Sequence, residues 1–455
     1  MAAATSPLEL RSSDQGLREG FLWAREQALA YVFHGDPVGD WYEAALPGRQ
    51  AFCMRDVSHQ CTGAASLGLR SQNLNMLRRF AENISPSRDW CSYWEIDRRN
   101  LPCPADYRDD AHFWYNLPAN LDVLSACWRQ YLWTGDRAYL DDGALRFFYD
   151  ATMSKYVPRW DRDGDGIPEH YPEYGYRGLS SYDEAETTRK ALVAGDLVAV
   201  LYAAYRDFAS IMDLDGNAMQ AAESRRRAGT LRESYNRDWW LPGERRFAGM
   251  MRQDRTYDPR EVEMAGVMGL LSGIVAEGEK TEGTLARVEA MKGQGVEIRS
   301  YLPDLLYRYG RNGAAYAELK ARVDPSLHRR EYPEVSYAVV GDIVTGLMGV
   351  SADARDLSVA TRPRLTPDTA WAELLGLGVL GNSIELRHEP GPTSTCANAS
   401  GPSFYWKATF PGRCAHIAVD GRASPADCAT DINGQLVSWV YVRMEPGARR
   451  SATPA

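Results

Sequence analysis

The sequence feature that most constrains the fold is a succession of segments in which apolar residues recur every three or four positions, the spacing of one helix face. Loops with Gly and Pro separate these segments. About six hairpins of this kind over roughly 340 residues, with long loops on the same side, predict an (α/α)6 toroid whose inner helices open into one central cleft. The predicted helices span residues 17–33, 54–84, 117–134, 137–156, 182–211, 217–240, 260–275, 281–292, 299–310, 313–323 and 332–350.

The residue pattern of the sequence changes near Ser351. From there on, short alternating or β-branched runs are separated by Gly, Pro and Asn-Gly turns, which is typical of strands joined by tight turns. A chain of 455 residues is also longer than one simple core usually supports. We therefore predict a mainly α protein with two parts: an (α/α)6 toroid catalytic domain over residues 1–350 and a small β-rich accessory domain over residues 351–455.

Charge and composition argue against several classes of partner and cofactor. A net charge of −9 disfavours nucleic acid or an anionic membrane surface. No apolar run approaches the roughly 20 residues of a membrane-spanning helix. The eight cysteines lack the spacing of a metal site, so we expect mostly reduced thiols, with a disulfide open only to the last three, and no metal or other cofactor. The oligomeric state is not indicated.

The first residues show no basic stretch followed by an apolar one. We therefore expect a cytoplasmic protein, or a periplasmic or secreted one if a signal peptide has been removed.

Residues 89–114 form an aromatic–acidic segment that fits neither a core nor a solvated loop. A core segment would not carry this many carboxylates, because each buried charge needs a partner, and a solvated loop would not carry this many large rings. Flat rings such as Trp94 cover the apolar faces of a sugar, and carboxylates bind its hydroxyls, so the segment predicts a carbohydrate site. The alternative is a structural ion-pair loop packed over a helix end.

Hydrolysis of a glycosidic bond needs two carboxyl groups across a cleft, and three places offer the proton donor. Asp109 and Asp110 are adjacent, so one can stay ionised while the other is pushed toward neutrality. Glu95 has apolar neighbours that would raise its pKa. The third place is the loop that holds Asp165 and Glu169.

The third place has a strong structural alternative. Its DRDGDG run, residues 161–166, resembles the first half of a calcium loop, but the twelfth position is Pro172 instead of Glu. A turn stabilised by Asp side chains explains the run without a metal.

For the second carboxylate we favour Glu334. It lies in the first turn of the last predicted inner helix, where the helix dipole helps keep a carboxylate ionised. A plain carboxylate at a helix start is the alternative, and Glu331 and Glu263 are weaker candidates.

Polar residues at the starts of the inner helices are candidates for holding the substrate. Asp56 and His59 lie one turn apart, so both can point into the cleft. A uronic acid would need a cation, which Arg55, His59 or Arg108 could supply. Each also has a structural alternative as a cap, an ion pair or packing. The further substrate-binding candidates are Trp94, His112, Trp114, Tyr115, Asn116, Glu169 and, as a stacking platform, Trp239.

Several short motifs resemble the six-hairpin glycosidase superfamily: DGDGIPE, the CPADYRDD loop, the Glu-bearing start of the last inner helix and RPRL. The CPADYRDD loop is similar to the CP-x-RDE loop of α-L-rhamnosidases, with Asp110 where that family has Glu, and the rest of that pattern is missing. The stretches FCMRDVSHQ, FWYNLPAN and YPEVS look more like β-glucuronidases on this fold. The resemblance implies a hydrolase that removes a terminal sugar, β-linked glucuronic acid in the narrower version, in polysaccharide degradation.

Two other classes of function stay open. One is a polysaccharide lyase on the same toroid, which would recruit a Tyr or His as base and an Arg or Asn to neutralise a uronate. The other is a non-catalytic toroid that binds glycans. An oligosaccharide or glycoside is the expected partner in all three cases.

Overall fold

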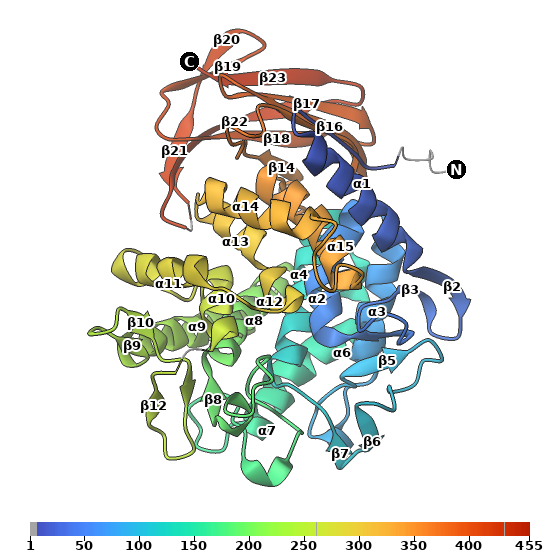
Figure 1. Ribbon diagram of the computed structural model, residues 1–455, viewed down its shortest axis with the longest axis vertical. Coiled ribbons are helices and arrows are strands. Elements are labelled where there is room, and N and C mark those ends of the chain that lie inside the picture. Colours follow the sequence, from blue (N-terminus) through green and yellow to red (C-terminus); the bar gives the residue numbers. More distant parts are fainter. Residues whose placement is uncertain (1–6, 261, 432) are drawn as a thin grey trace.

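The computed structural model describes residues 7–260, 262–431 and 433–455, and Figure 1 shows a helical body below a layered β region. The body contains an inner ring of helices, each in contact with the next, and the last in contact with the first. The inner helices are α2 (Met54–Ser66), α4 (Pro118–Thr134), α8 (Gly195–Leu214), α10 (Glu263–Ser272), α13 (Leu302–Arg308) and α15 (Pro333–Gly341), which η5 (Asp342–Leu347) continues. This ring confirms the predicted (α/α)6 toroid.

An outer layer of helices packs on the ring. Its members are α1 (Gln15–Ala30), α3 (Arg70–Glu82), α6 (Gly143–Ala151) with η2 (Thr152–Tyr156) and α7 (Val157–Trp160), α9 (Ala218–Asp238), α11 (Glu279–Ala290) and α14 (Asn312–Val323). The sequence explains the two layers. Inner helices such as α4 and α8 are apolar on most sides, whereas α9 buries one face and exposes its charged residues.

Three predicted helices were too long. Residues 54–84 split into α2 and α3, because the chain turns at Gly68, where φ is +87°. Residues 137–156 consist of α5 (Ala138–Asp141), α6 and η2. Residues 182–194 are a loop and the short strand β8 (Val193–Ala194) instead of the start of α8.

The inner ring closes where α2 meets α15, and glycine makes the closure possible. A Cβ atom on Gly63 would collide with the backbone carbonyl of Tyr337, and a Cβ on Gly341 would lie 3.5 Å from the backbone nitrogen of Gly63. The two backbones therefore touch almost directly. No other residue type fits at Gly63 unless the first and last inner helices move apart.

The β region contains two sheets, drawn as stacked layers in Figure 1. One has the strand order β1-β15-β16-β17-β23-β19-β20, and the other has the order β13-β14-β18-β22-β21. The strands are β13 (Ser351–Asp353), β14 (Ser358–Thr361), β15 (Ala372–Val379), β16 (Asn382–Glu389), β17 (Thr393–Ser400), β18 (Phe404–Pro411), β19 (His416–Val419), β20 (Arg422–Pro425), β21 (Asp427–Thr430), β22 (Leu436–Met444) and β23 (Arg449–Pro454).

The strand β1 (Glu9–Ser12) pairs antiparallel with β15, so the start of the chain contributes to the C-terminal sheet. A boundary at residue 350 therefore does not separate all residues of the sheet from the toroid. All eight cysteines are free thiols, including the three in the β region. Within the described part of the chain, no helix is long and apolar enough to cross a membrane.

Short strands lie at the end of the toroid that is away from the β region (Figure 1). These strands hold the loops that precede the inner helices in a fixed geometry. They include β4 (Ala51–Cys53) paired with β5 (Glu95–Asp97), β6 (Tyr107–Asp109) paired with β7 (His112–Phe113), and β8 paired with β11 (Met250–Met251).

We predict that Gly63→Ala destabilises the protein by about 2 kcal/mol or more, because the added methyl group must push α15 away from α2. Chemical denaturation measures the loss. Gly229→Ala is the matched control: Gly229 lies on the exposed side of α9 with open space around it, so alanine there should stabilise by about 0.5–1 kcal/mol. Equal effects at the two positions would contradict the closure argument.

Candidate active site

The N-terminal ends of the inner helices surround a cavity of about 200 Å³, which we call the mouth cavity. It lies at the end of the toroid that carries the long loops. Its walls come from α2, α10, the loop before α8 and the segment around α12 (Val296–Arg299). The lining residues are Arg55, Tyr182, Asp183, Glu184, Met264, Gly295, Glu297, Ile298 and Tyr301.

Arg55 is the cation of the mouth cavity. Its ion-pair partners are the carboxylate oxygens of Asp56 at 3.8 Å and Glu184 at 3.9 Å, both beyond hydrogen-bond distance. Its Nε is buried and has no hydrogen-bond partner among the described residues. The guanidinium is therefore balanced in charge but retains donors for another group.

Glu334 lies in the first turn of α15, behind the wall of this cavity; it is only 3 % exposed and is not one of the lining residues. Burial raises the pKa of its carboxyl well above the ordinary value, and the negative charge of Asp56 adds to the effect. Both effects favour the protonated form, which is the opposite of the prediction that the helix dipole keeps Glu334 ionised.

Ser300 connects Glu334 to His59. Its Oγ lies 3.1 Å from Oε1 of Glu334, 2.9 Å from Nε2 of His59 and 2.6 Å from the carbonyl oxygen of Glu297. A hydroxyl has one proton to donate. When Ser300 donates it to the shorter contact, Glu297, a protonated Glu334 completes the network as a donor.

His59 forms part of the floor beneath the mouth. Its ring stacks on Tyr301 with centroids 3.7 Å apart. Burial, together with the charges of Arg322 and Arg129, lowers the pKa of His59 to about 3. The imidazole is neutral, so the structure contradicts the prediction that His59 supplies a cation for a uronate.

Asp56 is buried, and its negative charge acts on Glu334. It accepts a hydrogen bond from the thiol of Cys53 at 2.7 Å. Its predicted place at the start of an inner helix is confirmed, but the residue next to it, Arg55, lines the mouth cavity and Asp56 does not.

The aromatic–acidic segment uses most of its charges on itself. Asp109 accepts hydrogen bonds from His112 and Arg108, which together lower the pKa of its carboxyl to about 2. Burial acts to raise the pKa of Asp110, but hydrogen bonds from Ser87, Tyr107 and Arg88 outweigh it and lower the value to about 2. Neither aspartate is pushed toward neutrality, so the prediction of a split pair is wrong.

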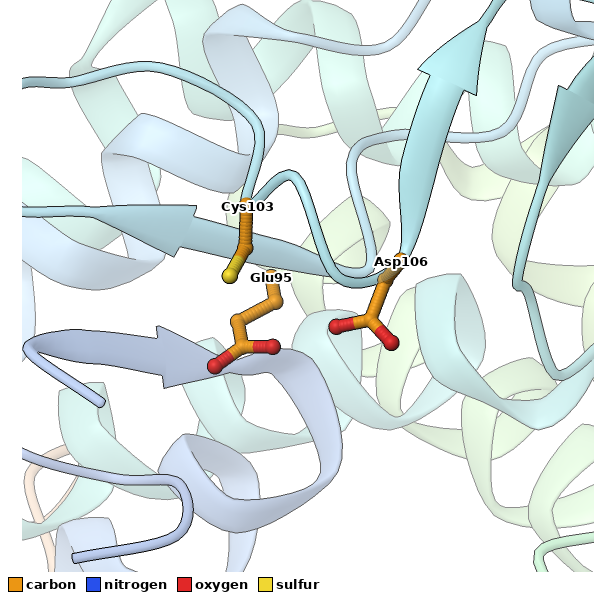
Figure 2. A group of neighbouring side chains, drawn as sticks. All are labelled: Glu95, Cys103 and Asp106. Carbon is orange, nitrogen blue, oxygen red and sulfur yellow. The ribbon is translucent and has the colours of Figure 1, made fainter. Parts of the chain in front are cut away.

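Glu95 lies in a cluster with Cys103 and Asp106 (Figure 2). Burial, and then the hydrogen bond and charge of Asp106, raise the pKa of Glu95 to about 9, which confirms the predicted direction. Arg49 lies 3.2 Å from the Glu95 carboxylate and 3.3 Å from that of Asp106. Arg49 takes the place that a cation would need, and Glu95 does not line the mouth cavity.

The DRDGDG loop is the turn stabilised by Asp side chains. Asp161 accepts hydrogen bonds from the backbone of Gly164 and Gly166, and Asp165 accepts one from Ile167. Glu169 is buried and bonded to Tyr171 and Arg255. The loop's carboxylates hold its own backbone and an ion pair, and none of them lines the mouth cavity.

The remaining predicted substrate-binding residues lie around the mouth or in the core. Trp94 is buried and its ring lies 6.3 Å from that of Tyr182 in the mouth wall. Trp239 is 3 % exposed and packs against Tyr235 and Tyr257, so it cannot serve as a stacking platform. Three others have structural partners: Tyr115 is buried and bonded to Asn120, Asn116 to Ser181, and the ring of Trp114 stacks on Tyr176. His112 and Arg108 are exposed beside Asp109.

Of the nine residues that line the mouth cavity, sequence reasoning found only Arg55, and the polar ones it missed include Tyr182, Asp183, Glu184 and Glu297. The signal was the acidic run SYDEAE, residues 181–186, which the predicted helix over 182–211 concealed. An acidic run that directly follows two serines and precedes an apolar helix is typical of a loop that leads into a helix.

No family profile and no curated protein matches the sequence. Among solved structures, the chain is similar to a rhamnosidase of glycoside hydrolase family 78 from Bacillus sp. GL1, with a TM-score of 0.62 at 14 % identity over 86 % of this chain and 41 % of that one. It is similar to an α-L-rhamnosidase from Dictyoglumus thermophilum, with a TM-score of 0.62 at 12 % identity over 100 % of this chain and 51 % of that one.

A third similar structure is an α-L-rhamnosidase from Aspergillus terreus, with a TM-score of 0.59 at 13 % identity over 98 % of this chain and 51 % of that one. The chain thus spans about half the length of these structures. The likeness establishes the fold, a six-hairpin (α/α)6 toroid with a C-terminal β domain. At such identities it does not establish the reaction.

We predict that Glu95→Gln changes how stability depends on pH. A carboxyl whose pKa is raised on folding stabilises the fold below its unfolded pKa, and that contribution is lost as pH rises toward about 9. Glutamine cannot ionise. The free energy of unfolding of Glu95→Gln relative to wild type, measured by chemical denaturation, should therefore rise between about pH 5 and pH 9 by at least about 1 kcal/mol. A difference that is flat with pH would contradict the buried, protonated state of Glu95.

Proposed function

We propose that the protein is a glycoside hydrolase that removes a terminal sugar from a glycan. One observation carries the proposal: carboxyl groups from separate loops meet at the mouth of the toroid, around Arg55. Asp183 and Glu184 come from the loop before α8, Glu297 from α12, and Glu334 from α15. Hydrolysis of a glycosidic bond requires two carboxyl groups that flank the bond.

The environments of these carboxyl groups differ, and each environment suits one of the two catalytic roles. Glu334 is buried, and the raised pKa of its carboxyl favours the protonated form, which suits the group that protonates the leaving oxygen. Asp183 and Glu184 line the open cavity, where one of them would activate water or attack the sugar. The pair differs from the sequence prediction, which took the proton donor from Glu95, Asp109, Asp110, Asp165 or Glu169. That prediction gave Glu334 the other role, the second carboxylate.

The shape of the mouth favours a chain end as substrate. The stacked rings of His59 and Tyr301 close the cavity from below, so a glycan cannot pass through. A sugar residue would enter with its free end first, which is the geometry of an exo-acting enzyme.

The narrower proposal, a terminal glucuronic acid, is supported by Arg55 alone. Its buried Nε has no partner among the described residues and could donate to a sugar carboxylate. The neutral state of His59 removes the second cation that the sequence offered.

A lyase acting on a uronate-containing glycan is the second candidate. The neutral imidazole of His59 stacks on Tyr301 near Arg55, and a lyase needs this combination of base and charge neutraliser. Elimination leaves an unsaturated sugar that absorbs ultraviolet light, whereas hydrolysis does not. Absorbance that rises with product would favour the lyase.

We predict that Glu334→Gln lowers kcat by about 10²- to 10⁴-fold on the nitrophenyl glycoside that wild type hydrolyses best, because glutamine cannot donate the proton. The panel should include β-glucuronide and α-rhamnoside. Asp183→Asn and Glu184→Gln identify the second group, since one of them should cause a comparable loss.

Glu279→Gln is the matched control, because Glu279 also lies in the first turn of a helix but is exposed. Its activity should equal wild type. Full activity of Glu334→Gln would contradict the assignment, and loss in Glu331→Gln instead would move the role to that exposed neighbour.

We predict that Arg55→Gln lowers kcat/KM for the β-glucuronide by about 10- to 100-fold, the effect of one charge-assisted hydrogen bond. Activity on any neutral glycoside that the protein hydrolyses should fall much less. Equal losses on charged and neutral substrates would rule out a role for Arg55 in selecting a uronic acid.

A further inference from the structure

A second cavity, of about 330 Å³, lies along the axis of the toroid, and all six inner helices line it. We call it the axial cavity. Tyr301 lines both cavities, and its stack with His59 forms the partition between them. The axial cavity takes no part in the proposed hydrolysis, and its size falls within the range of small-molecule sites, which begins at about 300 Å³.

One side of the axial cavity is apolar. Trp128 and Leu132 of α4 face Met268 and Leu271 of α10 and Val200 of α8 across this part of the lining. The ring of Trp128 is 5 % exposed and already in contact with other groups: it stacks on Tyr131, and Arg355 lies 5.6 Å from its centroid. The apolar side therefore offers C–H groups a set of packed side chains and not a free aromatic face.

The other side carries polar atoms that are buried without a hydrogen-bond partner among the described residues. These are Oγ of Ser58, Oγ of Ser125, the hydroxyl of Tyr301 and Oδ2 of Asp342. The four residues are 1 %, 2 %, 7 % and 4 % exposed. They come from four different helices or helix ends and all line the same space. Buried polar atoms are nearly always satisfied by protein, water or a ligand, so this space holds one of the latter two.

The charges of the lining are balanced within the wall. Asp304 is paired with Arg308 and accepts a hydrogen bond from Thr345. Arg129 donates to the carbonyl oxygen of Ser58, and Asp122 and Asp207 contribute opposite charge around it. Because carboxylates oppose these arginines, the positions without a partner are hydroxyl and carboxyl groups, which suit an uncharged ligand with many hydroxyls.

Solvent reaches the axial cavity away from the mouth. Arg206 is exposed and lines the cavity from the C-terminal half of α8, next to Ser272 at the end of α10. A ligand would therefore enter at the end of the ring opposite the proposed catalytic carboxyls.

We propose that the axial cavity is a second binding site, which takes a neutral polyhydroxy compound of monosaccharide size. The C–H groups of the ligand would pack on the apolar side, against Leu132, Met268 and Leu271, and its hydroxyls would bond to Ser58, Tyr301 and Asp342. The site is separate from the mouth cavity, so this proposal does not depend on the glycosidase proposal.

Titration calorimetry with the full chain tests this proposal, with D-glucose and myo-inositol as neutral probes and D-glucuronate as the charged one. We expect saturable binding of a neutral probe with a dissociation constant of about 1 mM or tighter. Arg55→Gln alters the mouth and should leave that binding unchanged.

Two variants of the axial cavity should weaken the binding at least about tenfold. Ala203→Leu fills part of the space from α8, and Asp342→Asn keeps the shape but changes the hydrogen bonds. An unchanged melting temperature in either variant shows that the fold is intact. Three results would overturn the proposal: no saturable binding of a neutral probe to wild type, which leaves water alone in the cavity; binding that Arg55→Gln abolishes; or binding that neither axial variant weakens.

Discussion

The contact between α2 and α15 is the constraint on which the rest of the structure depends. A toroid has no free helix face only if its last inner helix meets its first, and here the two backbones meet at Gly63 and Tyr337. The same contact brings the start of α2, with Arg55 and Asp56, next to the start of α15, with Glu334. Closing the ring and assembling the site are therefore one event, although the two helices are far apart in sequence.

Closure also explains the electrostatics of the mouth. It buries Glu334 near Asp56, and two carboxyl groups that share a poorly solvated place cannot both ionise easily. Arg55 offsets part of this charge without a tight ion pair. The result is a carboxyl with a raised pKa beside a small cavity, and a loosely paired cation and open carboxylates that line it. A fold needs none of these for stability, and such perturbed groups cluster at functional sites.

The sequence was informative wherever a property is local. Apolar periodicity predicted most helices and the β region, and helix starts placed Arg55, Asp56, His59 and Glu334 near one cleft. The predictions from sequence failed where residues far away in the chain decide the state of a side chain. Arg88 and Arg49 fix the states of Asp110 and Glu95 from other loops. Asp183 was missed because the apolar periodicity of the sequence cannot show that a helix begins at Gly195 and not thirteen residues earlier.

The central claim is that a terminal sugar binds at the mouth, between Glu334 and the loop before α8. A crystal structure of Glu334→Gln with its uncleaved glycoside tests this most directly. The account predicts that the glycosidic oxygen lies within hydrogen-bond distance of the substituted side chain, with Asp183 or Glu184 across the sugar from it. A glycoside bound instead against Asp109 and Asp110, or in the DRDGDG loop, would contradict the account.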